Sequence, residues 1–268
     1  MALLVVLFSQ ADAQKIRRGK WELGIMAGGS NYHGDLASEI VLKETHFSTG
    51  ILMKNNLSKY MAYRIQLCYG AISGHDKNFK NYNYRALLFK SNIWELGGQF
   101  EFNFRAFGIN PTEKHSTAYL VTGLNVFAFN PKVRYGSGDW IEARNIGTEG
   151  QGLDNYKKRY SLIQLSVPMG MGYKISINKN LVLGFETVFR KTFTDYLDDV
   201  SGEYPDYQTM KDKKGDLAAE LSQPQTLSGG KVIVDKTQRG DPHLKDWYFI
   251  TAFTLTYRFV TLGKCPQF

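Results

Sequence analysis

The chain has 268 residues, carries a formal net charge of +8 and shows no shift in composition along its length, so a single domain is expected. No internal apolar run approaches the 18 residues that a membrane-spanning helix needs, which excludes a helical membrane bundle. Glycine is abundant at 26, proline is scarce at 7, and aromatic residues make up 14% of the chain, a balance that favours strands and turns. The mean hydropathy of −0.32 is compatible with a membrane β-barrel, whose strands turn only alternate residues to lipid.

Residues 1–13 are typical of a secretory signal peptide. An apolar run from Ala2 to Phe8 precedes Ala11-Asp12-Ala13, a small-x-small triplet that predicts cleavage before Gln14, although the basic residues that usually open such a signal are missing. A buried first strand is the competing interpretation. No cysteine follows the cleavage site, so a lipoprotein is not expected. For an exported chain nucleic acid is an unexpected partner, and the positive charge is expected to meet anionic lipid headgroups or acidic protein surfaces.

Eight segments are predicted to be strands, most of them at least as long as the roughly 9–11 residues that cross a bilayer. They are residues 20–30, 46–54, 60–74, 87–105, 117–129, 160–175, 181–193 and 247–259. Alternation is clearest in the last, where Trp247, Phe253 and Leu255 share one face and Thr254 and Thr256 share the other. A period of two with one apolar and one polar face is typical of a transmembrane barrel.

A soluble β-sandwich with one wet face would show the same period. The connecting segments favour the barrel, because they alternate in length. Those at 55–59, 106–116 and 176–180 are short, and those at 31–45, 75–86, 130–159 and 194–246 are generally longer. Outer-membrane barrels have short periplasmic turns and long extracellular loops. We therefore predict an all-β fold: a single eight-stranded antiparallel up-and-down barrel over residues 14–259, a periplasmic tail at 260–268, and both termini in the periplasm.

The predicted inward faces carry four acids and four bases. They are Glu22, Glu95, Glu101 and Glu186 against Arg64, Arg105, Arg190 and Arg258. Charges inside a narrow barrel must pair, because an unpaired charge there is costly to desolvate. The balance favours a salt-bridged plug; an ion path, the alternative, would more naturally show one sign in excess.

Candidate catalytic and metal groups are few. Five histidines, at positions 33, 46, 75, 115 and 243, fall in predicted loops, turns or strand mouths, so solvated loop residues are favoured over a Ser–His–acid site. Asp195, Asp198 and Asp199 concentrate carboxylates that Ca²⁺ could use, but their spacing does not match an EF-hand, and solvated or ion-paired acids are the preferred interpretation. No cofactor is expected. The rest of that loop is polar and rich in lysine, which is compatible with a mobile segment, a lid or a binding surface.

Two smaller features have structural interpretations. The glycines between Gly147 and Gly152 have the wrong spacing for a phosphate loop and predict a tight extracellular turn. Cys68 is predicted to point into the barrel and Cys265 to lie in the periplasmic tail, so an internal disulfide is doubtful and pairing of Cys265 with another protein is a hypothesis.

Several segments together resemble the PorG family of outer-membrane barrels. They are Gly28–Leu36, Ser91–Leu96, Gly147–Gly152, Arg190–Gly202 and Lys264-Cys265-Pro266, of which Arg190–Gly202 is the most specific. The resemblance covers nearly the whole mature chain but not the loop from Tyr207 to Lys245.

The resemblance implies a non-enzymatic role in the type IX secretion system of Bacteroidota, which serves protein export and gliding. The family is thought to anchor a periplasmic ring of PorK and PorN to the outer membrane. The expected docking surface is the periplasmic turns and tail, with Asn55, Lys59, Lys179, Lys264 and Cys265 as candidate contacts. A small transport or ligand-binding barrel, and an outer-membrane enzyme acting on lipid, are the alternatives.

Overall fold

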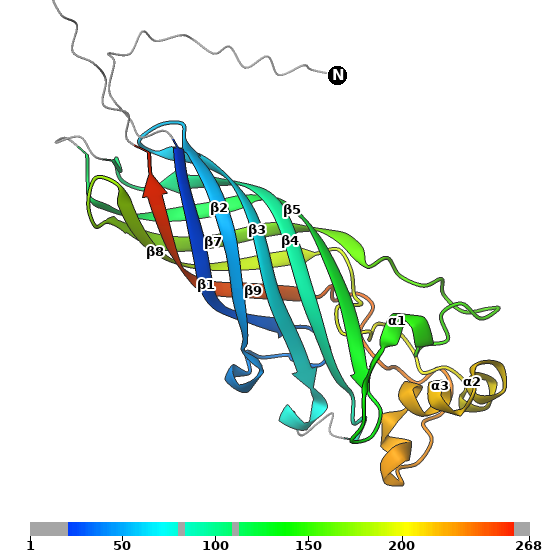
Figure 1. Cartoon of the computed structure of the whole chain (residues 1–268). Helices are drawn as coiled ribbons and strands as arrows, with labels where there is room; N and C mark the ends of the chain where they lie inside the picture. The colour runs from blue at the N-terminus through cyan, green and yellow to red at the C-terminus, as the bar shows by residue number, and fades with distance from the viewer. Residues whose placement is uncertain (1–20, 80–83, 109–112, 260–268) are drawn as a thin grey trace, which may run out of the picture.

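Eight long antiparallel strands close into a barrel in the computed structural model, which describes residues 21–79, 84–108 and 113–259 (Figure 1). The strands are β1 (Trp21–His33), β2 (His46–Asn56), β3 (Met61–His75), β4 (Leu88–Asn103), β5 (Ser116–Arg134), β7 (Ile163–Ser176), β8 (Leu181–Thr192) and β9 (Trp247–Arg258). They neighbour one another in the order β4-β3-β2-β1-β9-β8-β7-β5, and a β4–β5 pairing closes the circle. Closure leaves no exposed sheet edge. The eight-stranded barrel predicted from the sequence is confirmed.

The strands differ from prediction mainly at their ends. β5 continues five residues past its predicted end at Phe129 and forms a hairpin with the short strand β6 (Trp140–Glu142), which pairs only with β5. β4 ends at Asn103 instead of Arg105. Alternation over the middle of a strand identifies it well, whereas its ends depend on tertiary partners that the local pattern does not contain.

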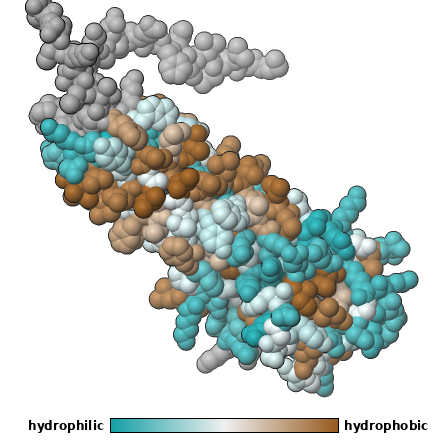
Figure 2. Space-filling view, viewed as in Figure 1, coloured by the Kyte–Doolittle hydropathy of each residue, from teal (hydrophilic) through white to brown (hydrophobic). Residues whose placement is uncertain are grey.

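The outward face of the barrel is apolar and the inward face is polar. In β1, Trp21, Leu23 and Ile25 are 47%, 52% and 59% exposed, whereas Glu22 between them is 1% exposed. On the face seen in Figure 2, most of the barrel has a hydrophobic surface, and the end at the lower right has a mostly hydrophilic one. An exposed apolar surface of this extent marks a membrane interface, and a band about 25 Å tall is what membrane barrels present to lipid. The fold is that of an outer-membrane barrel.

The two ends of the barrel are built differently. At one end, which we call the turn end, the strands are connected by residues 57–60, 104–115 and 177–180. The backbone N–H of Phe259 donates to the carbonyl of Trp21 at this end. The first strand therefore begins, and the last strand ends, at the turn end. At what we call the loop end, the connections are residues 34–45, 76–87, 135–162 and 193–246, the third including β6. The predicted signal peptide 1–13 and tail 260–268 lie outside the described residues.

All helical segments of the described chain lie in the loop-end connections, and they cluster with the loops (Figure 1). They are the 3-10 turns η1 (Leu42–Glu44), η2 (Asp76–Asn78) and η3 (Pro224–Ser228) and the helices α1 (Ala143–Ile146), α2 (Tyr207–Lys214) and α3 (Asp216–Ser222). Among the described residues, no helix has both the length and the apolar character to cross a membrane. The polar loop 193–246 is folded: Leu197, Val200 and Leu221 are buried within it.

Candidate functional site

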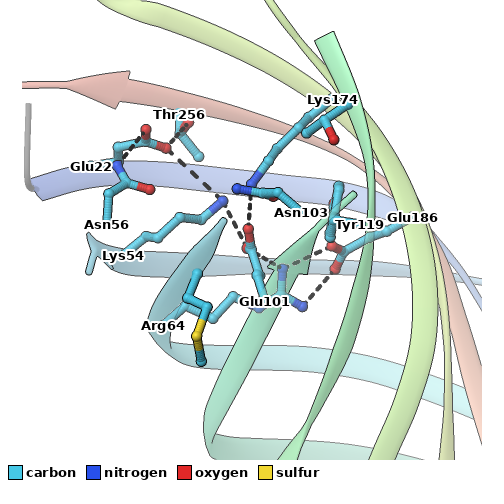
Figure 3. A network of polar contacts seen from close by, with 12 residues as sticks. Glu22, Lys54, Asn56, Arg64, Glu101, Asn103, Tyr119, Lys174, Glu186 and Thr256 are labelled. Atoms are coloured by element: carbon cyan, nitrogen blue, oxygen red, sulfur yellow. Dashed lines mark hydrogen bonds and ion pairs between the residues drawn. The ribbon is translucent and has the colours of Figure 1, made fainter. Parts of the chain in front are cut away.

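A network of charged side chains fills the barrel lumen near the turn end (Figure 3). Glu101 on β4 is its centre and is 1% exposed. One carboxylate oxygen of Glu101 lies 2.7 Å from Lys54 Nζ, and the other lies 2.6 Å from Lys174 Nζ. Arg64 Nη1 lies 3.4 Å from the first of these oxygens. Three cations from β2, β3 and β7 therefore surround one carboxylate.

Two further carboxylates complete the network. Glu186 accepts two hydrogen bonds from the Arg64 guanidinium, at 2.8 and 2.9 Å, and a third from the Tyr119 hydroxyl at 2.7 Å. Glu22 accepts from Arg258 Nε at 2.8 Å and lies 3.9 Å from Lys54. Paired charges with all these extra hydrogen bonds can remain buried, because the bonds replace the lost water.

A second, smaller cluster lies in the lumen on the loop-end side. Glu95 on β4 lies 3.2 Å from Arg190 Nε and accepts a hydrogen bond of 2.5 Å from the Tyr248 hydroxyl. The Arg190 guanidinium stacks near the Tyr248 ring, 5.8 Å from its centroid, and donates to the Val188 carbonyl. Cys68 is buried and points into the barrel, as predicted. The small space beside it cannot hold a water molecule.

The structure brings seven of the eight lumen residues named from the sequence into these clusters. Arg105 does not join them: it follows the end of β4, its side chain is exposed, and its backbone N–H donates to Thr117 Oγ1. Extending the alternation of β4 two residues too far caused this error. The sequence pattern does not single out Lys54 and Lys174, although each lies on the inward face of its strand. In β7 the inward positions before Lys174 are Gly170 and Gly172, which hide the alternation.

The loop end is closed by a buried cap made from all four long connections. The Tyr32 hydroxyl at the end of β1 lies 2.6 Å from Asp198 Oδ2 and 2.9 Å from Asp246 Oδ1. A hydroxyl carries one hydrogen and can donate it to one carboxylate only. The second short contact is a hydrogen bond if Asp198 or Asp246 carries a proton and donates it to the Tyr32 oxygen.

Two buried arginines tie the loops of the cap together. Arg239 Nη1 donates to Glu149 Oε1 at 3.1 Å and to the Asp199 carbonyl at 2.6 Å. Arg85 forms an ion pair with Asp76 at 2.7 Å and donates to the carbonyl of Arg239. These contacts join residues up to 154 positions apart in sequence.

Acids outnumber bases in this cap, and burial sets their protonation. Burial, together with the neighbouring carboxylate Asp246, raises the pKa of Asp198 well above its ordinary value, and burial has the same effect on the pKa of Asp246. Burial also raises the pKa values of Asp195 and Asp199 to about 6, in Asp199 against the opposing effect of Arg239. The cap therefore holds carboxyl groups that keep their protons above the usual range of aspartate.

The weak metal candidates Asp195, Asp198 and Asp199 do not converge on one point. Asp198 faces Tyr32, and Asp199 accepts hydrogen bonds from Thr148 and from the Tyr160 hydroxyl. Within residues 21–79, 84–108 and 113–259, no group of three or more potential ligand side chains is arranged to hold a metal ion.

One serine, one histidine and one acid do meet at the loop end, but in the wrong order for nucleophilic catalysis. His46 Nε2 lies 2.7 Å from Ser73 Oγ, and the carboxylate of Glu44 also contacts Ser73 Oγ. A Ser–His–acid triad needs the acid on the second ring nitrogen of the histidine, where it orients the base. Here the acid competes for the hydroxyl, and no triad results.

An open cleft of about 1060 Å³ lies among the outer loops. Its lining comes from residues 149–157 and 202–243 and includes the exposed side chains of Asp154, Lys157, Glu203 and Asp235. The glycine-rich segment beside it forms the expected tight turns, with positive φ angles at Gly147, Gly150 and Gly152.

At the turn end, the candidate partner contacts lie on the barrel rim. Lys59 and Lys179 are exposed in the connections after β2 and β7, and Asn55 is half-buried near the end of β2. Lys264 and Cys265 lie outside the described residues.

A family model described as a domain of unknown function (DUF6089) matches residues 1–220. The chain belongs to the DUF6089 family. The DUF6089 match spans seven of the eight barrel strands and ends before β9. No curated protein matches the sequence.

Solved structures similar to this DUF6089 chain include three proteins from bacteria. Neisserial surface protein A is 8% identical, with 90% of this chain and 97% of that chain covered and a TM-score of 0.42. Ail, the attachment invasion locus protein of Yersinia pestis, is 10% identical, with 90% and 99% covered and a TM-score of 0.40. The N-terminal barrel domain of Pseudomonas aeruginosa OprF is 9% identical, with 89% and 97% covered and a TM-score of 0.36. These likenesses concern the fold alone.

Proposed function

We propose that this chain is a non-enzymatic, structural component of the type IX secretion system in the outer membrane. In this role it anchors the periplasmic ring of PorK and PorN to the membrane and supports protein export and gliding. Both termini and the turn end then face the periplasm, and the loop end faces the cell exterior.

The observation that carries the proposal is how the segments that resemble the PorG family interlock. Gly28–Leu36 contributes Tyr32, which contacts Asp198 of Arg190–Gly202. Ser91–Leu96 contributes Glu95, which pairs with Arg190. From Gly147–Gly152, Glu149 accepts from the backbone N–H groups of Ser201 and Gly202. Four segments far apart in the sequence thus form one buried unit, which supports treating the resemblance as one of a whole structure and not of scattered short motifs.

The filled lumen supports an anchoring role over a conduit. Its charges are paired, and the cap covers its loop end, so the barrel itself offers no passage for a folded or unfolded cargo chain. The barrel then acts through partners that bind to its outer surfaces. The turn end is the surface that a periplasmic ring could reach, and Lys59 and Lys179 project from it.

Deletion of the gene tests the proposal most directly. We expect cargo with a C-terminal sorting domain to stay inside the cell and the PorK and PorN ring to be lost from outer-membrane fractions. Normal export with an intact ring would refute the type IX role and leave the small transport or ligand-binding barrel as the alternative.

Charge reversal on the rim maps the contact. Lys59→Glu with Lys179→Glu should lower recovery of ring proteins with the solubilised barrel, and Lys213→Glu on α2, which reverses an exposed charge at the loop end, is the control. Non-reducing gels of the wild type and Cys265→Ser ask whether Cys265 forms an intermolecular disulfide; identical migration would remove that idea.

A further inference from the structure

We propose that Lys90 on β4 and Lys132 on β5 bind a phosphate group of a lipid headgroup in the outer leaflet of the membrane. The inference rests on the outer-membrane location and orientation proposed above, but not on the type IX role.

Both lysines stand on the lipid-facing side of the barrel, just beyond the apolar surface. On β4 the outward positions run from Leu96 and Trp94, which are 56% and 55% exposed, through Asn92 to Lys90. From Trp94 to Lys90 the strand advances four residues, or about 13 Å along its own direction. At the usual strand tilt of about 40°, this corresponds to roughly 10 Å along the membrane normal. The polar headgroup layer begins at the edge of the hydrocarbon and is about 5–7 Å deep on each side. The flexible lysine side chain can therefore place its ammonium group among the headgroups.

The register sets two like charges side by side. Lys90 pairs directly with Lys132 across β4 and β5, and like charges in this arrangement destabilise a sheet. Neither lysine has an ion pair within 4 Å among the described residues. An anion between them would remove the repulsion.

The acid opposite Lys132 in the strand register does not fill this role. Glu142 on β6 faces Lys132 in the β5–β6 register, but its two carboxylate oxygens accept hydrogen bonds from Asn130 and Asn145 at 2.9 and 2.6 Å. Its carboxylate is thus held by amides.

Two neighbours extend the positive, interfacial character of the site. The Lys90 ammonium lies 4.0 Å from the centroid of the Trp140 ring, and tryptophan is enriched where barrels meet headgroups. Arg134, the next outward residue of β5, is exposed, and its guanidinium is held by the carbonyls of Ser137 and Gly138. A phosphate approaching from the membrane would meet three cations.

Native mass spectrometry of the full chain in a nonionic detergent, with lipid A as the probe, tests the proposal. We expect lipid A to remain bound to the wild type. Binding should be roughly thirty-fold weaker in Lys90→Gln/Lys132→Gln, since each lysine near an anionic surface contributes about a factor of five. Lys213→Gln/Lys231→Gln removes two exposed charges from the loop 193–246 and should bind as the wild type does. Equal binding by all three proteins would overturn the proposal.

Two further measurements test whether the ligand is the lipid or a free anion, and whether binding needs both positive charges. Inorganic phosphate at the same concentration should not displace lipid A; full displacement would indicate a site for the free anion and overturn the lipid assignment. Lys132→Glu gives Lys90 an internal partner and should abolish binding while the barrel keeps its heat-dependent gel mobility. Undiminished binding by this variant would also overturn the proposal. Cargo export is measured separately in the deletion strain, so failure of the type IX role and failure of lipid binding are distinguishable.

Discussion

Arg64 and Glu186 face each other from opposite sides of the barrel and form two hydrogen bonds, at 2.8 and 2.9 Å, across the lumen. Their strands, β3 and β8, are separated by β2, β1 and β9, so half of the barrel lies between them on either side. This contact, with the cations around Glu101, joins the walls through the interior. The sheet is thereby held from inside as well as by its own ladders.

Removing Arg64 should be strongly destabilising. Arg64→Met leaves Glu186 and part of the Glu101 charge without a cation in a buried place, and loss of one partner of such a pair typically costs about 3–5 kcal/mol. Urea unfolding in detergent or lipid measures the free energy of unfolding. Arg64→Met/Glu186→Gln should recover part of the loss, because it removes the orphaned carboxylate; a double variant no more stable than the single one would contradict this account.

The paired lumen should not conduct ions. We expect the wild-type barrel in a planar bilayer to give no steady current, whereas Arg64→Ala/Glu186→Ala, which removes the bridge across the lumen, should give a small one. A stable ohmic conductance in the wild type would contradict the plug and favour the transport alternative.

The strands of this barrel could be predicted from the sequence because each buries one face and exposes the other to lipid. Alternation such as that of Trp21, Glu22 and Leu23 is visible without any tertiary information. The lumen partners were harder to predict. Arg105 has the right spacing but lies beyond the last ladder bond of β4, and Lys174 follows glycines that carry no pattern.

The cap could not be predicted at all from local pattern. Its polar residues are buried because distant segments supply their partners, as Asp246 does for Tyr32, 214 positions away. From the sequence, Asp198 and Asp199 are interpreted as solvated acids or as part of a weak metal site, because their distant partners are not visible there. In the structure they form hydrogen bonds with Tyr32 and Tyr160.

The cap should loosen as pH rises. Burial raises the pKa of Asp198 and Asp246 in the folded state, so the folded protein keeps a proton that the unfolded chain has released. The contribution of these two groups to the stability of the cap is then greatest at low pH and is lost as pH rises through their raised pKa. Asp195 and Asp199 have pKa values of about 6, so they also lower the stability of the cap as pH rises from about 4 to 6. Proteolysis of the loop 193–246 should be faster at pH 8 than at pH 5, after correction with an unstructured reference peptide. Asp246→Asn, which keeps the shape without the charge, should flatten this dependence, and an unchanged dependence would rule out the shared proton as its cause.

Arg239 should control access to the same loop without affecting the barrel. Arg239→Met removes the cation from Glu149 and the donor from the Asp199 carbonyl, leaving a buried carboxylate without a counter-charge and a buried carbonyl without this donor. Proteinase K should then cut the loop 193–246 faster, while the heat-dependent gel mobility of the barrel stays as in the wild type. Lys236→Gln, which removes an exposed charge three residues earlier, is the matched control and should be cut at the wild-type rate.

On intact cells the same assay reports orientation: cutting of Arg239→Met by added protease places the loop end outside, and cutting only after the outer membrane is permeabilised would reverse the proposed direction of the barrel.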